Sequence, residues 1–342
     1  MKEARKPAAL LILLITALML AACGGEVKNS GTDSKPVNST DNAGQKQEEP
    51  VKEEQLAQEE TAPENSATRL FKDWTGHEVE VPTNPQRVIY HGETTGDLLA
   101  LGVVPVGVMK LNISGSVFEK QLNGAEDIGF PFNVEKAMTL DPDLIIFSNA
   151  DAAQYEQISK VAPTVTFNTF ASLEDRMHTL GKLFDKQQEA QQWLDNYNNK
   201  AKDMWAQLNE AGVGEGETAS VFTLYPGNRI FAMANTGLSQ VLYDEGGFKP
   251  TPPIQKALDE GQGFIEISAE LLAEFAGDRV FLLTPVDPEA IKDTNELVKS
   301  NTWLSLPAVK NEQVYTFHIL EAYSDAISRE WILNELPKAL IP

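Results

Sequence analysis

Polar and aromatic side chains follow several apolar runs of the sequence, where they could contact a ligand. In the first half of the chain these side chains are Tyr90, His91, Glu93, Lys110, Asn112, Ser148 and Asn149. In the second half they are Tyr225, Arg229, Thr284, His318 and Tyr323. Side chains beyond the carboxyl ends of strands are those that touch ligands in α/β lobes, and charged donors and aromatic faces bind polar ligands noncovalently. The pattern therefore favours a binding site.

The motifs of common catalytic centres are absent from the sequence. Gly-x-Ser-x-Gly, His-Glu-x-x-His and the P-loop do not occur. Glu93 and Asp97 could act as acid and base in an exported enzyme, but one turn of helix explains their spacing better. We expect a protein that is not an enzyme, with an exported enzyme as the less favoured alternative.

Cys23 is the only cysteine, and it follows a segment typical of exported lipoproteins. Basic residues precede an apolar run at 8–20, which is short for a membrane span of about 20 residues. Leu20-Ala21-Ala22-Cys23 resembles the bacterial lipobox, in which the thiol is alkylated with diacylglycerol. We expect residues 1–22 to be a cleaved signal peptide, and acyl chains such as palmitate on Cys23 to anchor the protein. An ordinary signal peptide beside an incidental cysteine is the alternative.

Composition separates a tether from a folded body and argues against one class of partner. Residues 23–68 carry few large apolar side chains, so they cannot offset the entropy of ordering and are expected to form a disordered tether. The chain has 28 Lys and Arg against 50 Asp and Glu, a net charge of −22. Binding to nucleic acid needs clustered cations and is therefore not expected.

Residues 69–170 alternate between strand and helix patterns. After a hairpin at 70–81, strands are expected at 87–90, 103–108, 144–147 and 164–167. Helices are expected at 97–102, 133–138 and 151–161. This alternation predicts a parallel sheet covered on both faces.

A long helical segment at 171–209 separates this lobe from a second one at 210–342. Gly181 and Asp185 are expected to divide it, leaving a helix at 186–209 on the order of 35 Å long. In the second lobe, a hairpin is expected over 220–232, helices at 238–245, 269–275 and 324–340, and strands at 279–283 and 314–317. The prediction is an α/β fold in which two Rossmann-like lobes are joined by a single long helix.

An ordered set of short blocks resembles the substrate-binding proteins of bacterial iron-siderophore and cobalamin ABC importers. In the first half these blocks are Val79-Glu80-Val81-Pro82, Pro85-Gln86-Arg87-Val88, Leu99 to Gly107, Ile128-Gly129, Asn133-Val134-Glu135-Lys136, Leu140 to Ile146 and Val161-Ala162-Pro163-Thr164. In the second half they are Gln240 to Tyr243, Ile267 to Leu272, Trp303 to Lys310 and Gln313-Val314-Tyr315. The set covers nearly everything after the tether.

This resemblance implies a monomer on the extracytoplasmic face of the cell membrane that hands its ligand to a permease, homodimeric or heterodimeric, with its ATPase. The connecting helix is expected to be rigid, with the ligand cleft between the lobes. One glutamate on each lobe is expected to dock on permease arginines, and the matching positions are Glu135 and Glu270. A carboxylate near a helix N-terminus can make such contacts, although both could simply stabilise the start of a helix.

The resemblance also implies a ferric-siderophore ligand whose iron is held by the chelator, with no cofactor and no direct metal ligand. Such complexes are oxygen-rich and often anionic, so Lys110 and Arg229 are the contacts expected first. The other expected contacts are Tyr90, His91, Asn149, Tyr225, His318 and Tyr323.

The ligand's exact chemistry stays open. Gly237 stands where a hydroxamate-binding subgroup of the family has an arginine, so hydroxamate, citrate-hydroxamate and catecholate complexes all remain possible. Haem or cobalamin would also fit the family, with His91, Tyr225 or Tyr323 as haem ligands. Bare Zn²⁺ or Mn²⁺ is less favoured because the four histidines are scattered and only His91 and His318 could face the cleft together.

Overall fold

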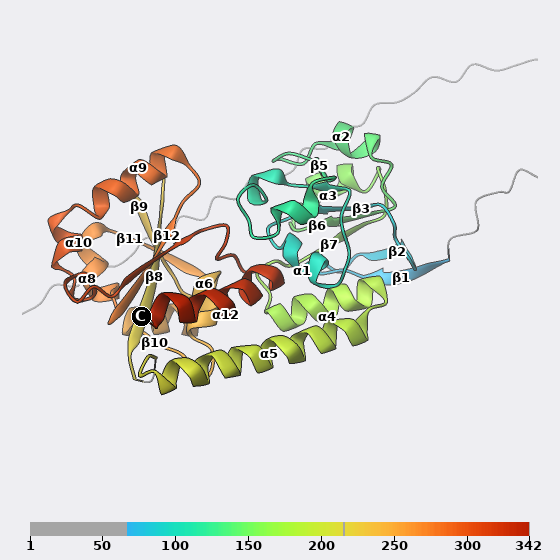
Figure 1. The fold of residues 1–342 in the computed structure, drawn as a ribbon. Helices are drawn as coiled ribbons and strands as arrows, with labels where there is room; N and C mark the ends of the chain where they lie inside the picture. The colour runs from blue at the N-terminus through green and yellow to red at the C-terminus, as the bar shows by residue number, and fades with distance from the viewer. Residues whose placement is uncertain (1–66, 215, 342) are drawn as a thin grey trace, which may run out of the picture. The chain divides into compact units, whose positions relative to one another are not determined.

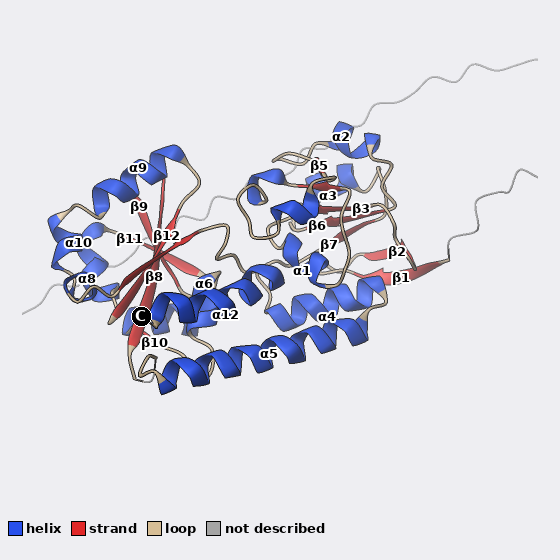
Figure 2. Ribbon diagram, viewed as in Figure 1, coloured by secondary structure: helices blue, strands red, loops and turns tan. Residues whose placement is uncertain are grey.

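The computed structural model describes residues 67–214 and 216–341, which lie within one compact unit of the chain. The predicted signal peptide, Cys23 and all but the last two residues of the predicted tether lie outside this part. Figure 1 shows two lobes, with helix α5 running below both of them and α4 below the first lobe. Figure 2 shows that each lobe contains a sheet flanked by helices. The expected α/β fold is therefore present.

The first lobe is built on a parallel sheet with the strand order β5-β4-β3-β6-β7. The hairpin of β1 and β2 precedes this sheet. The strands are β1 Thr68–Lys72, β2 Glu78–Pro82, β3 Val88–His91, β4 Gly107–Val108, β5 Glu126–Asp127, β6 Leu144–Phe147 and β7 Thr164–Thr166. The helices are α1 Thr95–Ala100, η1 Lys110–Asn112, η2 Glu119–Leu122, α2 Val134–Thr139 and α3 Ala152–Ile158. Every residue of β3 and β6 is buried, as expected for central parallel strands with both faces covered.

The second lobe contains a mixed sheet with the order β11-β9-β8-β12-β13, and β10 also pairs with β8. Its strands are β8 Thr218–Tyr225, β9 Arg229–Met233, β10 Lys249–Pro250, β11 Phe264–Ile267, β12 Arg279–Thr284 and β13 Val314–His318. Its helices are α6 Leu238–Leu242, α7 Pro252–Asp259, η3 Ala269–Leu271, α8 Leu272–Phe275, α9 Pro288–Leu297, α10 Asn301–Ser305, α11 Pro307–Lys310 and α12 Ala326–Leu340. The predicted hairpin is β8 and β9, whose turn places Gly227 and Asn228 at positive φ, a region that glycine and asparagine tolerate best.

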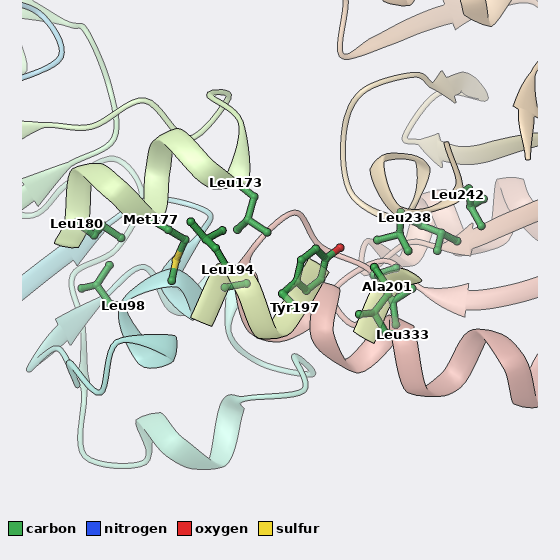
Figure 3. Packing of buried hydrophobic residues seen from close by; sticks show 14 of the residues in the cluster. Leu98, Leu173, Met177, Leu180, Leu194, Tyr197, Ala201, Leu238, Leu242 and Leu333 are labelled. Atoms are coloured by element: carbon green, nitrogen blue, oxygen red, sulfur yellow. The ribbon is translucent and has the colours of Figure 1, made fainter. Parts of the chain in front are cut away.

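Helices α4 (Leu173–Phe184) and α5 (Gln187–Glu210) connect the lobes. Asp185 adopts a left-handed conformation, with φ 54°, and ends α4 as expected; Gly181 lies inside α4 and does not break it. One apolar face of α5 packs against both lobes. The same buried cluster contains Leu98 of α1 in the first lobe and Leu180 of α4. It also contains Leu238 of α6 and Leu333 of α12 in the second lobe. Figure 3 shows these side chains in a row along α5, so the two lobes share one continuous core.

A buried ion pair joins the lobes beside this core. Arg176 of α4 is 1% exposed, and its Nε lies 2.7 Å from the Oδ2 of Asp97 on α1. The other Asp97 oxygen accepts a 2.8 Å hydrogen bond from the backbone N–H of Ala326, where α12 begins. Arg176 also donates to the carbonyl of Ser324 at 2.6 Å. Removing one partner of such a pair leaves the other charge buried, which typically costs about 3–5 kcal/mol.

Some local expectations are wrong. The strand expected over 103–108 is reduced to Gly107–Val108, because the Val103 N–H bonds to the Leu98 carbonyl and so completes the C-terminal cap of α1. Gly102 makes this cap possible with φ 71°. The helix expected at 269–275 is a 3₁₀ turn followed by the short α8.

Candidate functional site

A cleft of about 270 Å³ lies between the lobes at the carboxyl ends of their strands. The first lobe contributes residues that follow β3 and β7. The second contributes the end of β8, the end of β9 and the segment after it, the start of β11, Leu283 of β12 and the segment after β13. The lining residues are Glu93, Thr94, Thr169, Phe170, Tyr225, Met233, Thr236, Gly237, Phe264, Leu283, Ile319, Ala322, Tyr323 and Ser324. This position is the one expected for a ligand site in α/β lobes.

Two tyrosines and one glutamate give the cleft its chemical character. Tyr225 ends β8 and is 47% exposed, and Tyr323 lies in the segment between β13 and α12. Burial raises the pKa of both tyrosine hydroxyls, and the nearby carboxylate of Glu93 raises it further. Both hydroxyls are therefore neutral at physiological pH and can donate hydrogen bonds. Their rings add apolar surface to the cleft.

Glu93 reaches the solvent at the mouth of the cleft, although both lobes crowd around it. The resulting loss of hydration raises the pKa of its carboxyl group. No described cation lies within ion-pair distance of this carboxylate. Glu93 is therefore an acidic group without a salt-bridge partner in the described part of the chain.

The floor of the cleft is held by the groups that join the lobes. The Ser324 hydroxyl accepts a 2.7 Å hydrogen bond from the Gly237 N–H. The Ser324 carbonyl accepts from the buried Arg176. On the other wall, the Thr94 hydroxyl lies 2.7 Å from the hydroxyl of Tyr90. These contacts tie residues of both walls to the buried core beneath them.

A second hollow of about 270 Å³ adjoins the cleft and shares Tyr225, Met233 and Phe264 with it. Arg229 and Phe231 complete its lining. The Arg229 guanidinium contacts both carboxylate oxygens of Glu266, at 3.0 and 2.7 Å, and lies over the ring of Phe231. The positive charge of Arg229 is thus balanced by a neighbour on the same sheet.

The other residues predicted from the sequence lie elsewhere. Tyr90 is fully buried, and burial raises the pKa of its hydroxyl. His91 is also buried; its Nε2 donates to the Gly129 carbonyl at 2.9 Å, and burial lowers its pKa. His318 lines a separate hollow beside α12, and its Nδ1 accepts from the Leu320 N–H. Neither exposed residue, Lys110 or Asn149, is among the residues that line the cleft.

Glu135 and Glu270 are both exposed, and each stands in the first turn of a short helical segment. A hydrogen bond from the Ser268 hydroxyl lowers the pKa of Glu270. Glu135 follows β5, which pairs in parallel with β4. Glu270 follows β11, which is antiparallel to β9 and so runs in the same direction as β8. Neither glutamate is among the residues that line the cleft.

Sequence reasoning missed the apolar part of the cleft. Phe170 and Phe264 are 71% and 49% exposed, and both line it. Phe170 follows β7, so the criterion that selected Tyr225, a place at the carboxyl end of a strand, could also have selected Phe170. Phe264 begins a strand whose existence was not predicted, and no signal in the sequence pointed to it.

A larger hollow, about 770 Å³, lies elsewhere, along α5. Its lining comes from α4, α5, the segment after α6 and Arg329 of α12, with no residue from the carboxyl end of a strand. We assign the candidate site to the smaller cleft for this reason. Within the described residues, no group of three or more His, Cys, Asp or Glu side chains is placed to hold a metal ion, and no helix is long and apolar enough to cross a membrane.

Two α/β lobes with a cleft at the carboxyl ends of both sheets define a two-lobed binding protein. The family model described as "Periplasmic binding protein" matches residues 88–319, and the chain belongs to this family. This family consists of substrate-binding proteins and not of enzymes.

Curated relatives and solved structures resemble the chain over most of its length. The iron(3+)-hydroxamate-binding protein FhuD of Bacillus subtilis (strain 168) is 28% identical over 96% of this chain and 95% of its own. The petrobactin-binding protein YclQ of the same organism is 26% identical over 91% of this chain and 90% of its own. The crystal structure of Staphylococcus aureus SirA complexed with staphyloferrin B is 25% identical, with a TM-score of 0.68 over 80% of this chain and 98% of SirA.

Asp325, below the cleft, should make stability depend on pH. It is fully buried, and burial together with Asp97 raises its pKa to about 7. Between about pH 4 and pH 7 Asp325 therefore holds more of its proton in the native state than in the unfolded state, so its contribution to the free energy of unfolding falls as the pH rises. Asp325→Asn should remove this fall in the free energy of unfolding, which amounts to at most about 4 kcal/mol across that pH range.

The measurement is urea unfolding of the native protein and of the Asp325→Asn variant at several pH values from 4 to 8. The exposed substitution Asp203→Asn serves as control and should follow the native curve. If the native and Asp325→Asn curves run parallel across this range, Asp325 does not titrate as described.

Proposed function

We propose that the protein binds a ferric siderophore in the cleft between its lobes and delivers it to the permease of an ABC importer. The observation that carries this proposal is the cleft itself, at the carboxyl ends of both sheets, with the rings of Tyr225, Phe264 and Tyr323 in its walls. Curated relatives that align over most of the chain bind iron-hydroxamate and petrobactin. The chelator would hold the iron, so the protein needs to supply only shape, aromatic surface and hydrogen bonds.

The proposed contacts follow from position. Tyr225 and Tyr323 line the cleft, and Arg229 stands at its edge in the adjoining hollow. Tyr90 would act through Thr94, because its own hydroxyl is buried. A ferric siderophore is larger than 270 Å³, so it would fill both hollows and project into solvent.

Ligand titration tests this proposal. Intrinsic fluorescence of the purified protein should be quenched saturably, at submicromolar concentration, by at least one ferric siderophore, because an iron chelate absorbs the emitted light. The panel includes hydroxamate, citrate-hydroxamate and catecholate complexes, haem, cobalamin and free Zn²⁺ or Mn²⁺. Tyr225→Ala should weaken binding at least about tenfold, on the scale of a central aromatic contact.

The matched control for this variant is Phe130→Ala, which removes an exposed aromatic ring that does not line the cleft. It should leave the dissociation constant unchanged. A response confined to bare Zn²⁺ or Mn²⁺ would contradict the proposal, as would equal effects of the two substitutions.

We further propose that Glu135 and Glu270 dock on the permease. Their exposure and their matched positions, each in the first turn of a helical segment of its own lobe, support this role. Glu135→Lys together with Glu270→Lys should abolish siderophore uptake by cells, because reversed charges repel arginines, while the purified variant keeps its ligand affinity. Glu156→Lys reverses an exposed charge on α3 and should leave uptake intact. Lost ligand affinity in the double variant would refute the docking role.

Cys23 is proposed to carry the lipid anchor on the extracytoplasmic face of the membrane. The lipobox-like sequence Leu20-Ala21-Ala22-Cys23 supports this assignment. Cells that express the protein should incorporate labelled palmitate into it, and Cys23→Ala should abolish the label because the chain has no other cysteine. A native chain that takes up no label would exclude the anchor.

A further inference from the structure

Glu93 is the only charged side chain among the described residues that line the central cleft. The other lining residues are aromatic, aliphatic, hydroxyl-bearing or glycine. An oxygen-rich anion would need cationic donors in the same place. The cleft instead presents a single carboxylate to whatever occupies it.

Two arginines beside or beneath the cleft do not reverse this charge. Arg229 in the adjoining hollow is held by both oxygens of Glu266. Arg176 lies beneath the floor, where it is paired with Asp97 at 2.7 Å and is 1% exposed. Both of these arginine charges are therefore balanced, whereas Glu93 has no such partner among the described residues.

The position of Glu93 makes its charge effective. It follows β3 and stands on the first-lobe wall, with Tyr225 and Tyr323 on the second-lobe side of the same cleft. Partial exclusion of water from such a cleft weakens dielectric screening, so a charge there acts more strongly on a ligand than one on an open surface. The raised pKa of Glu93, caused by burial alone, is consistent with a carboxylate that has no positive neighbour.

We propose that Glu93 makes the cleft select ferric complexes by net charge, favouring positive over neutral and neutral over negative complexes. This inference rests on the proposed siderophore function and concerns a specificity-determining residue within it. Three hydroxamate anions balance Fe³⁺, so a trihydroxamate complex is neutral and a pendant ammonium makes it positive. Complexes held by additional carboxylates are negative and would be repelled.

A charge series built on one chelator tests the proposal. Ferrioxamine B carries a pendant ammonium group; acetylation of this amine gives a neutral complex, and succinylation gives a negative one. The iron coordination and most of the contact surface stay the same across the series. The purified protein should bind the three complexes with dissociation constants that rise roughly five- to tenfold per unit of negative charge added, a size typical of one partly screened charge.

Glu93→Gln keeps the shape of the side chain and removes its charge. This variant should bind all three complexes within about twofold of one another, because the described residues that line the cleft then carry no charge to distinguish them. Glu156→Gln, on the exposed face of α3, should retain the native order. The native preference should also shrink at 1 M salt, where the Debye length falls to about 3 Å.

The outcomes separate the two proposals. Binding of all three complexes with one affinity by the native protein would overturn the role of Glu93 and leave the siderophore function standing. An order that is the same in the native protein and in Glu93→Gln would overturn it too, because another group would then set the preference. If no ferric siderophore of any charge binds, the proposed function itself fails.

Discussion

The buried pair of Asp97 and Arg176 is the interaction on which the arrangement of the cleft depends. Asp97 belongs to the first lobe, Arg176 to the helix that flanks it, and both bond to the backbone where α12 of the second lobe begins. Charges taken out of water are stabilising only when every polar partner is in place. The pair therefore specifies one relation between the lobes. Gly96 allows it, because a Cβ there would lie 1.8 Å from the Asp325 carboxylate.

The apolar face of α5 extends this constraint along the molecule. Leu194, Tyr197 and Ala201 belong to the same buried cluster as core residues of both lobes. Separating the lobes would expose this surface to water at a cost of about 25 cal/mol for each Å². A cleft with such walls is largely formed before the ligand arrives. Preorganisation of this kind favours affinity, because little conformational entropy remains to be lost on binding.

Periodicity in the sequence predicted most of the framework, because β3, β6 and α5 bury continuous or regularly spaced apolar residues. The prediction from periodicity failed where backbone groups form hydrogen bonds outside the expected strand. The Val103 N–H donates to a carbonyl of α1 and completes its cap, so it does not take part in sheet pairing. Strand β11 also escaped prediction, because its burial follows from pairing with β9 and not from a strong pattern of its own. Such pairings join residues far apart in the chain, and periodicity cannot detect them.

The site was predicted in part for a related reason. Selecting residues beyond strand ends found Glu93, Tyr225 and Tyr323, all of which line the cleft. The same rule also selected Tyr90 and His91, but β3 continues through His91, so both side chains still lie between the sheet and its covering layers. The net charge of the site was harder to predict from the sequence than the positions of its residues. Arg229 looks like a free cation until β9 and β11 pair and bring Glu266 against it. That pairing balances the cation expected to attract anions, and the described residues that line the central cleft carry one charged group, the Glu93 carboxylate. Aromatic contact would then supply the affinity, and Glu93 would decide which complexes benefit from it.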